Sequence, residues 1–196
     1  MKHMDVLRRR RSVYEFTDES VAPQLIETLV AGVLTLTPSA FNEETQRVLL
    51  LFGEQHLLLW QLVEDEISKT VSEKAFARSQ AKINGFRKAQ GTILFFDDEE
   101  ATKALQAEYP LYSEAFARWS LEQNGMLQIN VWNALAEQGI GASLQHYNEL
   151  IAKKVETTFG VPAAWRLLAQ MPFGKYHALP APKEKQDVAT RMLIRK

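Results

Sequence analysis

Apolar positions in this chain follow two patterns, short unbroken runs and clusters at helical spacing. The runs at 48–52 and 91–96 have the length of strands, and an unbroken apolar run is typical of a strand buried on both faces. After Pro23, which suits the first turn of a helix, apolar residues recur on one helix face as far as Val33. We predict helices over 4–11, from 23 onward, 54–71, 72–86, 113–138 and 148–159, a loop over 36–42, and strands over 48–52, 91–96, 142–147 and 165–171.

The segment 113–138 differs from the other predicted helices because it is apolar around much of its circumference. A helix that is apolar on more than one face is a central one. The strands are separated by long helices and do not alternate strictly with them, which indicates an α+β sandwich. The tail from Pro180 is rich in proline and charge before it becomes apolar at 192–194, so we expect it to add to another sheet.

Composition restricts the classes of protein to consider. The 196 residues fit a single domain, 1–196, and a net charge of -1 gives no basic surplus for general nucleic-acid binding. Cysteine is absent, which excludes disulfides, thiolate metal sites and cysteine nucleophiles. No apolar run approaches the roughly 20 residues of a membrane span, and none follows the basic N-terminus as in a signal peptide. We therefore expect a cytoplasmic protein that binds neither nucleic acid nor membrane.

Four consecutive arginines, Arg8 to Arg11, followed by Ser12 are the most informative local feature. So much positive charge needs water or an anionic partner. The run fits a solvated helix face, a nucleic-acid or targeting patch, or a cradle for the phosphate of a cofactor. The chain lacks a second basic element of the kind that DNA binding requires.

Several common active-site patterns are missing from the sequence. There is no Gly-x-Ser-x-Gly elbow, and the four histidines show no paired metal spacing, so we expect neither a serine hydrolase nor a bound metal. The acids at 97–100 suit a solvated turn better than a cation site. No glycine-rich phosphate loop occurs either, so any nucleotide is held in another way.

Three polar segments offer that other way. Arg10, Arg11 and Ser12 combine forked guanidinium donors with a hydroxyl, which suits a phosphate monoester. The segment 38–42, Pro-Ser-Ala-Phe-Asn, ends in an amide that can pair with the edge of a ring. Two lysines, Lys183 and Lys185, bring positive charge late in the chain.

In their order and spacing these segments resemble the FMN-dependent nitroreductase family. The stretch from Gly125 to Gly141 is similar to that family's central helix and the turn after it. The segments 143–148, Ser-Leu-Gln-His-Tyr-Asn, and 170–174, Gln-Met-Pro-Phe-Gly, resemble its small bacterial and fungal members, which include copper-inducible and fatty-acid-response proteins. The resemblance spans nearly the whole chain.

The resemblance implies a nitroreductase-like three-layer α-β-α sandwich, with a mixed, mostly antiparallel sheet around the central helix. It implies a homodimer with FMN at the subunit interface and a C-terminal arm, about 180–196, that extends onto the partner. NADH or NADPH would reduce the FMN, and a nitroaromatic compound or a quinone would reoxidise it in a ping-pong cycle.

The resemblance also implies roles for individual residues. Residues expected at the phosphate and ribityl chain are Arg10, Arg11, Ser12 and Lys185, with Lys183 nearby. Residues expected along the flavin are Ser39, Ala40 and Asn42, of which the first two serve the partner's cofactor in one interpretation, and Gln145, His146 and Tyr147 near the reactive ring nitrogen. Arg8 and Arg9 are then a solvated or ion-paired helix face.

Two places depart from the family pattern. Tyr14 stands where many relatives carry a basic residue against the flavin's carbonyl edge, and Lys82 is a candidate to replace that charge. His146 and Tyr147 stand where others have an acid and a glycine, which predicts a bulkier pocket. Because the flavin carries the electrons, we expect no side-chain nucleophile. His146 is the one candidate proton donor, against an interpretation as a packed, hydrogen-bonded histidine.

An alternative function is a flavin-binding regulatory module in stress response, including oxidative stress, or in lipid signalling, with little turnover. A closed pocket around His146 and Tyr147 would favour such sensing. An open pocket would favour catalysis.

Overall fold

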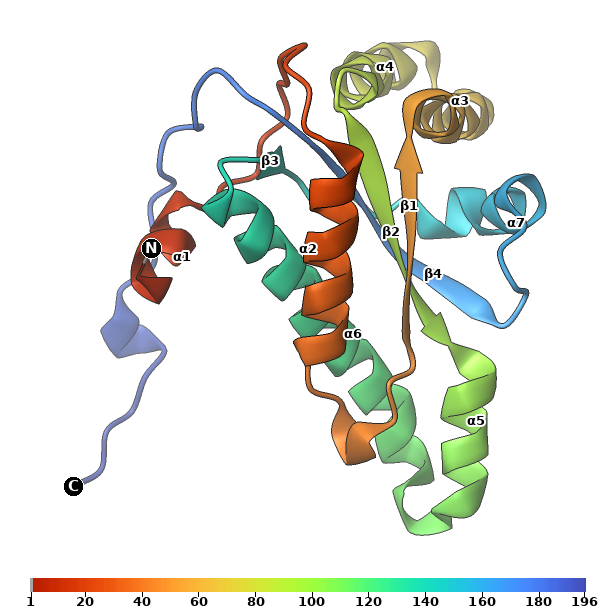
Figure 1. The fold of residues 1–196 in the computed structure, drawn as a ribbon, viewed down its shortest axis with the longest axis vertical. Coiled ribbons are helices and arrows are strands. Elements are labelled where there is room, and N and C mark those ends of the chain that lie inside the picture. Colours follow the sequence, from red (N-terminus) through yellow and green to blue (C-terminus); the bar gives the residue numbers. More distant parts are fainter. Residues whose placement is uncertain (1) are drawn as a thin grey trace.

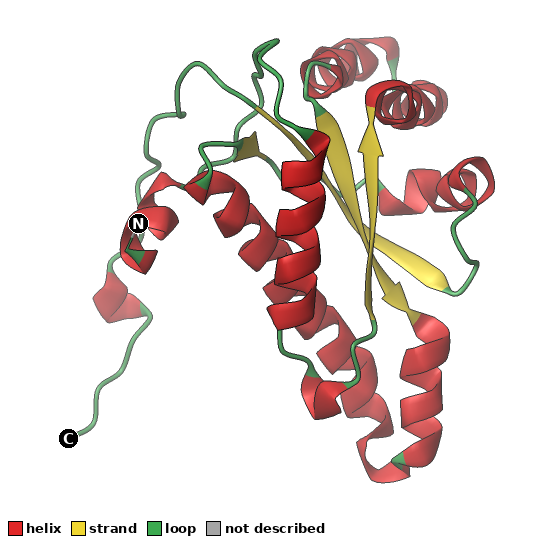
Figure 2. Cartoon of the chain, viewed as in Figure 1, coloured by secondary structure: helices red, strands yellow, loops and turns green. Residues whose placement is uncertain are grey.

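A four-stranded sheet forms the middle of the molecule in the computed structural model, which describes residues 2–196 (Figures 1 and 2). The strands lie in the order β1 (Gln46–Phe52), β2 (Gly91–Asp98), β4 (Trp165–Gly174) and β3 (Gly141–Ala142), and each pair of neighbours is antiparallel. The helices are α1 (His3–Arg9), α2 (Pro23–Leu36), α3 (Gly53–Thr70), α4 (Glu73–Arg87), α5 (Glu99–Glu108), α6 (Ser113–Glu137) and α7 (Asn148–Phe159).

Successive residues of β2 point into two different hydrophobic cores, as the alternation of a strand requires. Ile93 and Phe95 pack with α2 and α6 on one face of the sheet. Leu94 and Phe96 pack with α3, α4 and α7 on the other face. The sheet is therefore covered by helices on both sides, which confirms the three-layer sandwich (Figure 1).

The predicted central helix is α6, and it is buried along one side only within this chain. Leu127 and Val131 are completely buried against the sheet and α2, and Phe116 is completely buried against the rings of Phe41 and Tyr109. Met126 and Ile129, on other faces of the same helix, remain 45% and 39% exposed. Helix α6 therefore carries apolar side chains that the packing within this chain does not bury.

The prediction of a strand over 142–147 is wrong, because β3 ends at Ala142. The chain then leaves the ladder, and only one isolated bridge joins Gln145 to Gln170. The side chain of Gln170 takes over the pairing, since its Oε1 accepts a hydrogen bond from the Tyr147 amide at 2.8 Å. In contrast, β4 is longer than predicted and continues through Pro172 to Gly174.

The prediction of a solvated acidic turn at 97–100 is also wrong. Asp97 is a buried residue of β2, and Asp98 caps a helix, α5, that the sequence pattern did not reveal. The Asp98 carboxylate accepts a hydrogen bond from the Ala101 amide at 3.2 Å. Glu99 and Glu100 then lie in the first turn of α5, where negative charge interacts favourably with the helix dipole.

Three smaller features concern the segments predicted at 4–11, 48–52 and 36–42. Helix α1 ends at Arg9, so Arg10 and Arg11 lie in extended chain after it instead of on a helix. The run at 48–52 contacts both cores but is half-buried at most positions, because β1 is an edge strand. The predicted loop at 36–42 contains a single short turn, Ala40–Asn42.

The C-terminal tail runs away from the sheet past α1, and both chain ends lie on the same side of the molecule (Figure 1). Residues 177–196 are exposed throughout, and their one regular element is a short turn at Val188–Thr190. No helix between Lys2 and Lys196 is long and apolar enough to cross a membrane.

Candidate functional site

Arg10 and Arg11 have different environments although they are adjacent in sequence. The Arg10 guanidinium lies over the Trp132 ring of α6, 4.2 Å from its centroid, which is the geometry of a cation–π contact. Burial, together with the neighbouring charge of Arg11, lowers the pKa of Arg10 from its ordinary value. Arg11 instead donates from Nη2 to the carbonyl oxygen of Ala181 in the tail at 2.6 Å.

No described carboxylate pairs with either of these guanidinium groups. Within residues 2–196, neither Arg10 nor Arg11 forms an ion pair, and the Ser12 hydroxyl has no hydrogen-bond partner. Arg8, in contrast, pairs with Asp5 at 3.0 Å, which confirms its place on an ion-paired helix face. Two unpaired guanidinium groups and a free hydroxyl fit a phosphate monoester, the group by which FMN would be held.

The sheet positions this donor set. Ser12 forms a parallel bridge with Ala142, and the Val13 amide donates to the Ala142 carbonyl at 2.9 Å. The N-terminal segment therefore lies against β3. The residues that follow β3, 143–147, leave the sheet at the same place, so the structure brings the arginine segment close to the predicted Gln145–Tyr147 segment.

Gln170 holds that segment in position, and sequence reasoning did not identify its role. Gln145 and Gln170 exchange backbone hydrogen bonds of 2.7 and 2.9 Å, and the buried Gln170 side chain binds the Tyr147 amide and the Asn148 side chain. His146 is exposed and makes no hydrogen bond among the described residues, so its backbone N–H and imidazole are available to a ligand. The sequence signal that could have identified this role is the position of Gln170, a polar residue within the apolar run of β4.

Tyr14 and Tyr147 lie together beside α4. The Tyr14 ring centroid is 6.2 Å from that of Phe86, and Tyr147 packs edge-on against Trp60 at 6.0 Å. Burial, with a smaller contribution from Tyr14, raises the pKa of Tyr147. Ser12 and Tyr14 therefore lie near the 145–147 segment. With Arg10 and Arg11, which directly precede Ser12, and Gln145, His146 and Tyr147 they form one candidate group.

Ser39, Ala40 and Asn42 do not join that group. They lie beyond the C-terminal end of α2, while β3 lies toward the opposite end of α6 (Figure 1). A cavity of about 240 Å³ opens there, lined by Pro38, Ser39, Ala40, Trp119, Glu122, Gln123 and Met126. The cavity therefore lies along residues 119–126 of α6, whereas Arg10 contacts the same helix farther along, at Trp132.

A buried chain of polar groups holds the Ser39–Asn42 loop, and the sequence did not reveal it. Asp97 accepts a hydrogen bond from the Thr45 hydroxyl at 2.7 Å, and Gln123 Nε2 donates to Thr45 at 2.9 Å. Gln123 Oε1 then accepts from the Ala40 amide at 3.0 Å. Beyond Ala40 the loop continues through Phe41, which has a φ of 52°, an uncommon backbone conformation for a bulky residue. Such conformations persist where surrounding contacts fix them, and they gather at functional sites.

The remaining predicted residues lie farther out. Lys82 is exposed on α4, one turn before Gly85, where an added Cβ atom would lie 3.0 Å from the Tyr14 carbonyl oxygen. Lys183 and Lys185 are exposed in the tail, just after the Ala181 that contacts Arg11, and neither forms an ion pair in the part of the chain that the structure describes.

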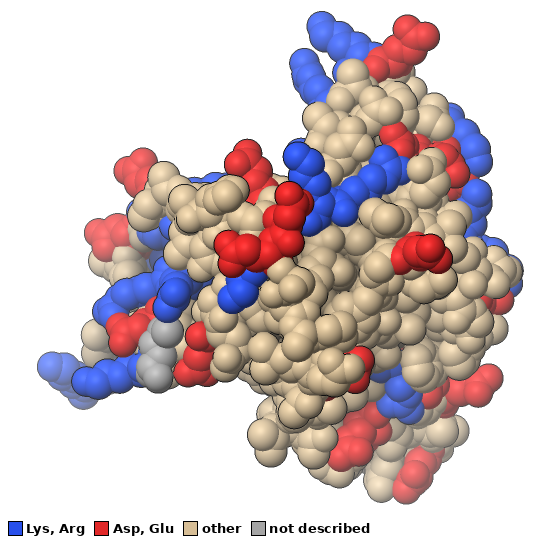
Figure 3. Space-filling view, turned by 45° about the horizontal axis from the view of Figure 1, so that its top comes forward, with Lys and Arg blue, Asp and Glu red and all other residues tan. Residues whose placement is uncertain are grey.

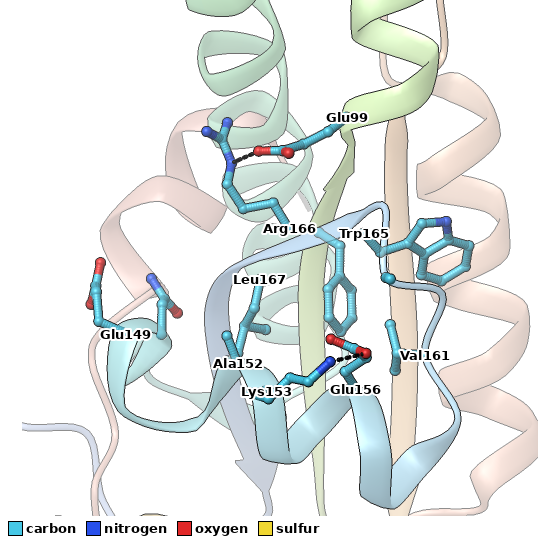
Figure 4. Close-up of a pocket in the computed structure, with 12 residues that line it drawn as sticks. Glu99, Glu149, Ala152, Lys153, Glu156, Val161, Trp165, Arg166 and Leu167 are labelled. Carbon is cyan, nitrogen blue, oxygen red and sulfur yellow. Dashed lines mark hydrogen bonds and ion pairs between the residues drawn. The ribbon is translucent and has the colours of Figure 1, made fainter.

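A larger hollow of about 440 Å³ lies elsewhere, between α7 and β4 (Figure 4). Phe96, Val161 and Leu167 contribute apolar lining. At its rims Arg166 pairs with Glu99 at 3.4 Å and Lys153 pairs with Glu156 at 2.5 Å. Its charged groups are therefore largely satisfied by one another. No group of three or more potential metal ligands occurs among the described residues, here or elsewhere.

Comparison with known proteins agrees with this geometry. Residues 7–175 match the model of the Nitroreductase family. The Saccharomyces cerevisiae protein HBN1 is 33% identical to this chain over 191 residues, covering 95% of each.

Solved structures show the same similarity. The nitroreductase CinD from Lactococcus lactis, in complex with chloramphenicol, superposes over 100% of both chains with a TM-score of 0.91 and 35% identity. CinD has also been solved with 4-nitrophenol. A nitroreductase with bound FMN from Desulfitobacterium hafniense shares the fold over 100% of both chains, with a TM-score of 0.74 and 16% identity.

Proposed function

Because the chain belongs to the Nitroreductase family, and is therefore an oxidoreductase, we propose that it uses FMN and NADH or NADPH to reduce nitroaromatic compounds or quinones. The observation that carries the proposal is the unneutralised Arg10–Arg11 pair with the free Ser12 hydroxyl, beside a segment fixed to β4 by Gln170. CinD supports the acceptor class, since both chloramphenicol and 4-nitrophenol carry an aromatic nitro group.

In this proposal Arg10, Arg11 and Ser12 hold the phosphate, and the 145–147 segment lies along the flavin ring. Bound FMN would supply the redox chemistry between the nicotinamide and the acceptor. The free backbone N–H of His146 is a donor toward the ring. The exposed His146 imidazole is the candidate proton donor to the acceptor.

Two copies of the chain are needed to complete each site. No arginine or lysine lines the cavity at Ser39 and Ala40, and the arginine group lies apart from that cavity. We therefore propose a homodimer in which one copy supplies the arginine group and the other the Ser39–Ala40 cavity to each site. Apolar side chains that a partner would cover are exposed on α2 and α6: Leu25, Leu36, Leu121, Met126 and Ile129. Figure 3 shows a wide area near the middle of the view without acidic or basic side chains. The tail, with Lys183 and Lys185, would extend onto the partner.

The exposure of the 145–147 segment distinguishes turnover from sensing. His146 is exposed and Tyr147 half-buried, so the surface on which a flavin would lie is open to solvent. An open site admits a donor and an acceptor in turn, which supports the enzyme over the stress-response or lipid-signalling module.

The test is the cofactor content and size of the purified protein. We expect a yellow dimer that releases about one FMN per chain on denaturation, since each dimer interface would form two equivalent sites. A colourless monomer that does not take up added FMN would overturn the proposal.

A further inference from the structure

We propose that a basic stripe on α4 binds the phosphates of the dinucleotide donor and makes NADPH the preferred reductant over NADH. The stripe consists of Lys74, Arg78 and Lys82. The inference rests on the proposed function, because it concerns the donor that would reduce the flavin at the same site.

The three cations of the stripe share one helix face. They are spaced four residues apart, so their side chains line up along α4, and all three are exposed. From Lys2 to Lys196 none of them forms an ion pair or a side-chain hydrogen bond. Lysines on other helices differ, since Lys69 pairs with Glu66 at 2.7 Å. The stripe therefore presents unneutralised positive charge to solvent.

The C-terminal end of the stripe reaches the candidate flavin site. Gly85 follows Lys82 by one turn, and a Cβ atom there would lie 3.0 Å from the Tyr14 carbonyl oxygen. Tyr14 is two residues from Ser12, in the segment that carries the proposed phosphate donors. From Lys82 the stripe runs outward to Lys74 over about 12 Å, because a helix rises about 1.5 Å per residue.

A dinucleotide donor matches this layout. Its nicotinamide has to lie on the flavin, so its pyrophosphate and then its adenosine ribose extend away from the ring. In NADPH that ribose carries an additional 2′-phosphate, which places a second cluster of negative charge farther out. A line of cations contacts both clusters, whereas NADH offers only the inner one. Uncharged quinones gain nothing from the stripe.

The experiment compares Lys74→Gln/Arg78→Gln with a matched control, Lys103→Gln/Lys153→Gln, in which both lysines lie on other helices and already pair with carboxylates. At low ionic strength we expect the stripe variant to raise KM for NADPH about tenfold, because two charge-assisted contacts are lost, and KM for NADH less. We expect kcat, KM for a neutral quinone and FMN content to stay as in the control. Added salt is expected to raise KM for NADPH in the wild type and much less in the stripe variant.

Calorimetric binding of the fragment 2′,5′-ADP against AMP gives a readout that does not depend on turnover. We expect the wild type to prefer 2′,5′-ADP and the stripe variant to lose that preference. Equal binding of the two fragments by the wild type, or an equal KM for NADPH in the stripe and control variants, would overturn the inference. A wild-type protein whose flavin neither NADPH nor NADH reduces would instead overturn the proposed function.

Discussion

The guanidinium of Arg10 lies 4.2 Å from the centroid of the Trp132 ring, which fixes one side of the proposed phosphate site to α6. A cation–π contact of this kind contributes about 0.5–2 kcal/mol. Replacing Trp132 by Leu should leave Arg10 less well positioned and raise the dissociation constant of FMN by about 2- to 30-fold. Fluorescence titration of the protein with FMN measures this dissociation constant. Trp165→Leu, which removes a longer contact with Arg47 at 5.8 Å, is the control and should leave FMN affinity unchanged.

Arg11→Ala should weaken FMN binding further, because it removes a proposed phosphate donor. The fold should tolerate the change, since among residues 2–196 no carboxylate is left unpaired by the loss of Arg11. Each charge-assisted hydrogen bond lost costs about 1.5–3 kcal/mol, so we expect an increase of at least about tenfold in the dissociation constant. Arg9→Ala, at the exposed end of α1, is the matched control. The phosphate assignment would be wrong if both variants retained wild-type FMN affinity with an unchanged melting temperature.

Helical periodicity and apolar runs were sufficient to predict most elements, since α2, α3, α4, α6 and α7 begin and end within about two residues of expectation where both ends were predicted. Two elements were mispredicted for a physical reason. The 143–147 segment is held by the side chain of Gln170, which is distant in sequence, and α5 begins with acids that resemble a solvated turn. The candidate donors could be proposed from the sequence because they follow one another along the chain. The contacts of Trp132 with Arg10 and of Gln123 with Ala40 depend on the packing of α6, which the sequence does not display.

The buried His56 should make stability depend on pH. Its Nε2 faces the Arg87 carbonyl and its Nδ1 lies 2.9 Å from the Thr92 hydroxyl, so the neutral ring is satisfied. Burial lowers the pKa of His56 from 6.5 to about 4. The unfolded chain therefore binds the proton first, and stability should fall as pH drops from about 6.5 to about 4.

The loss from this group should approach about 3 kcal/mol, at about 1.4 kcal/mol per pKa unit. Urea unfolding at several pH values measures it, with His56→Gln as the comparison. The variant should be less stable at pH 7 but should lose less stability on acidification. Parallel pH profiles for the two proteins would contradict the buried, neutral histidine.

Thr45→Val should both destabilise the fold and loosen the Ser39–Asn42 loop, because the Thr45 hydroxyl joins Asp97 to Gln123. Leaving those buried groups short of a partner costs about 1–3 kcal/mol. We expect a lower urea midpoint together with faster dissociation of FMN. Thr35→Val, at an exposed hydroxyl that bonds only to its own helix, should change stability by less than about 0.5 kcal/mol. An unchanged FMN dissociation rate in Thr45→Val would separate this loop from the flavin site.

The two half-reactions of the purified protein, followed anaerobically by the visible absorbance of the flavin, test the central claim most directly. One equivalent of NADPH should bleach the absorbance, and subsequent 4-nitrophenol or a quinone should restore it, since the proposed cycle reduces and reoxidises the same bound FMN in turn. Flavin absorbance that stays unchanged with both NADPH and NADH would contradict the account.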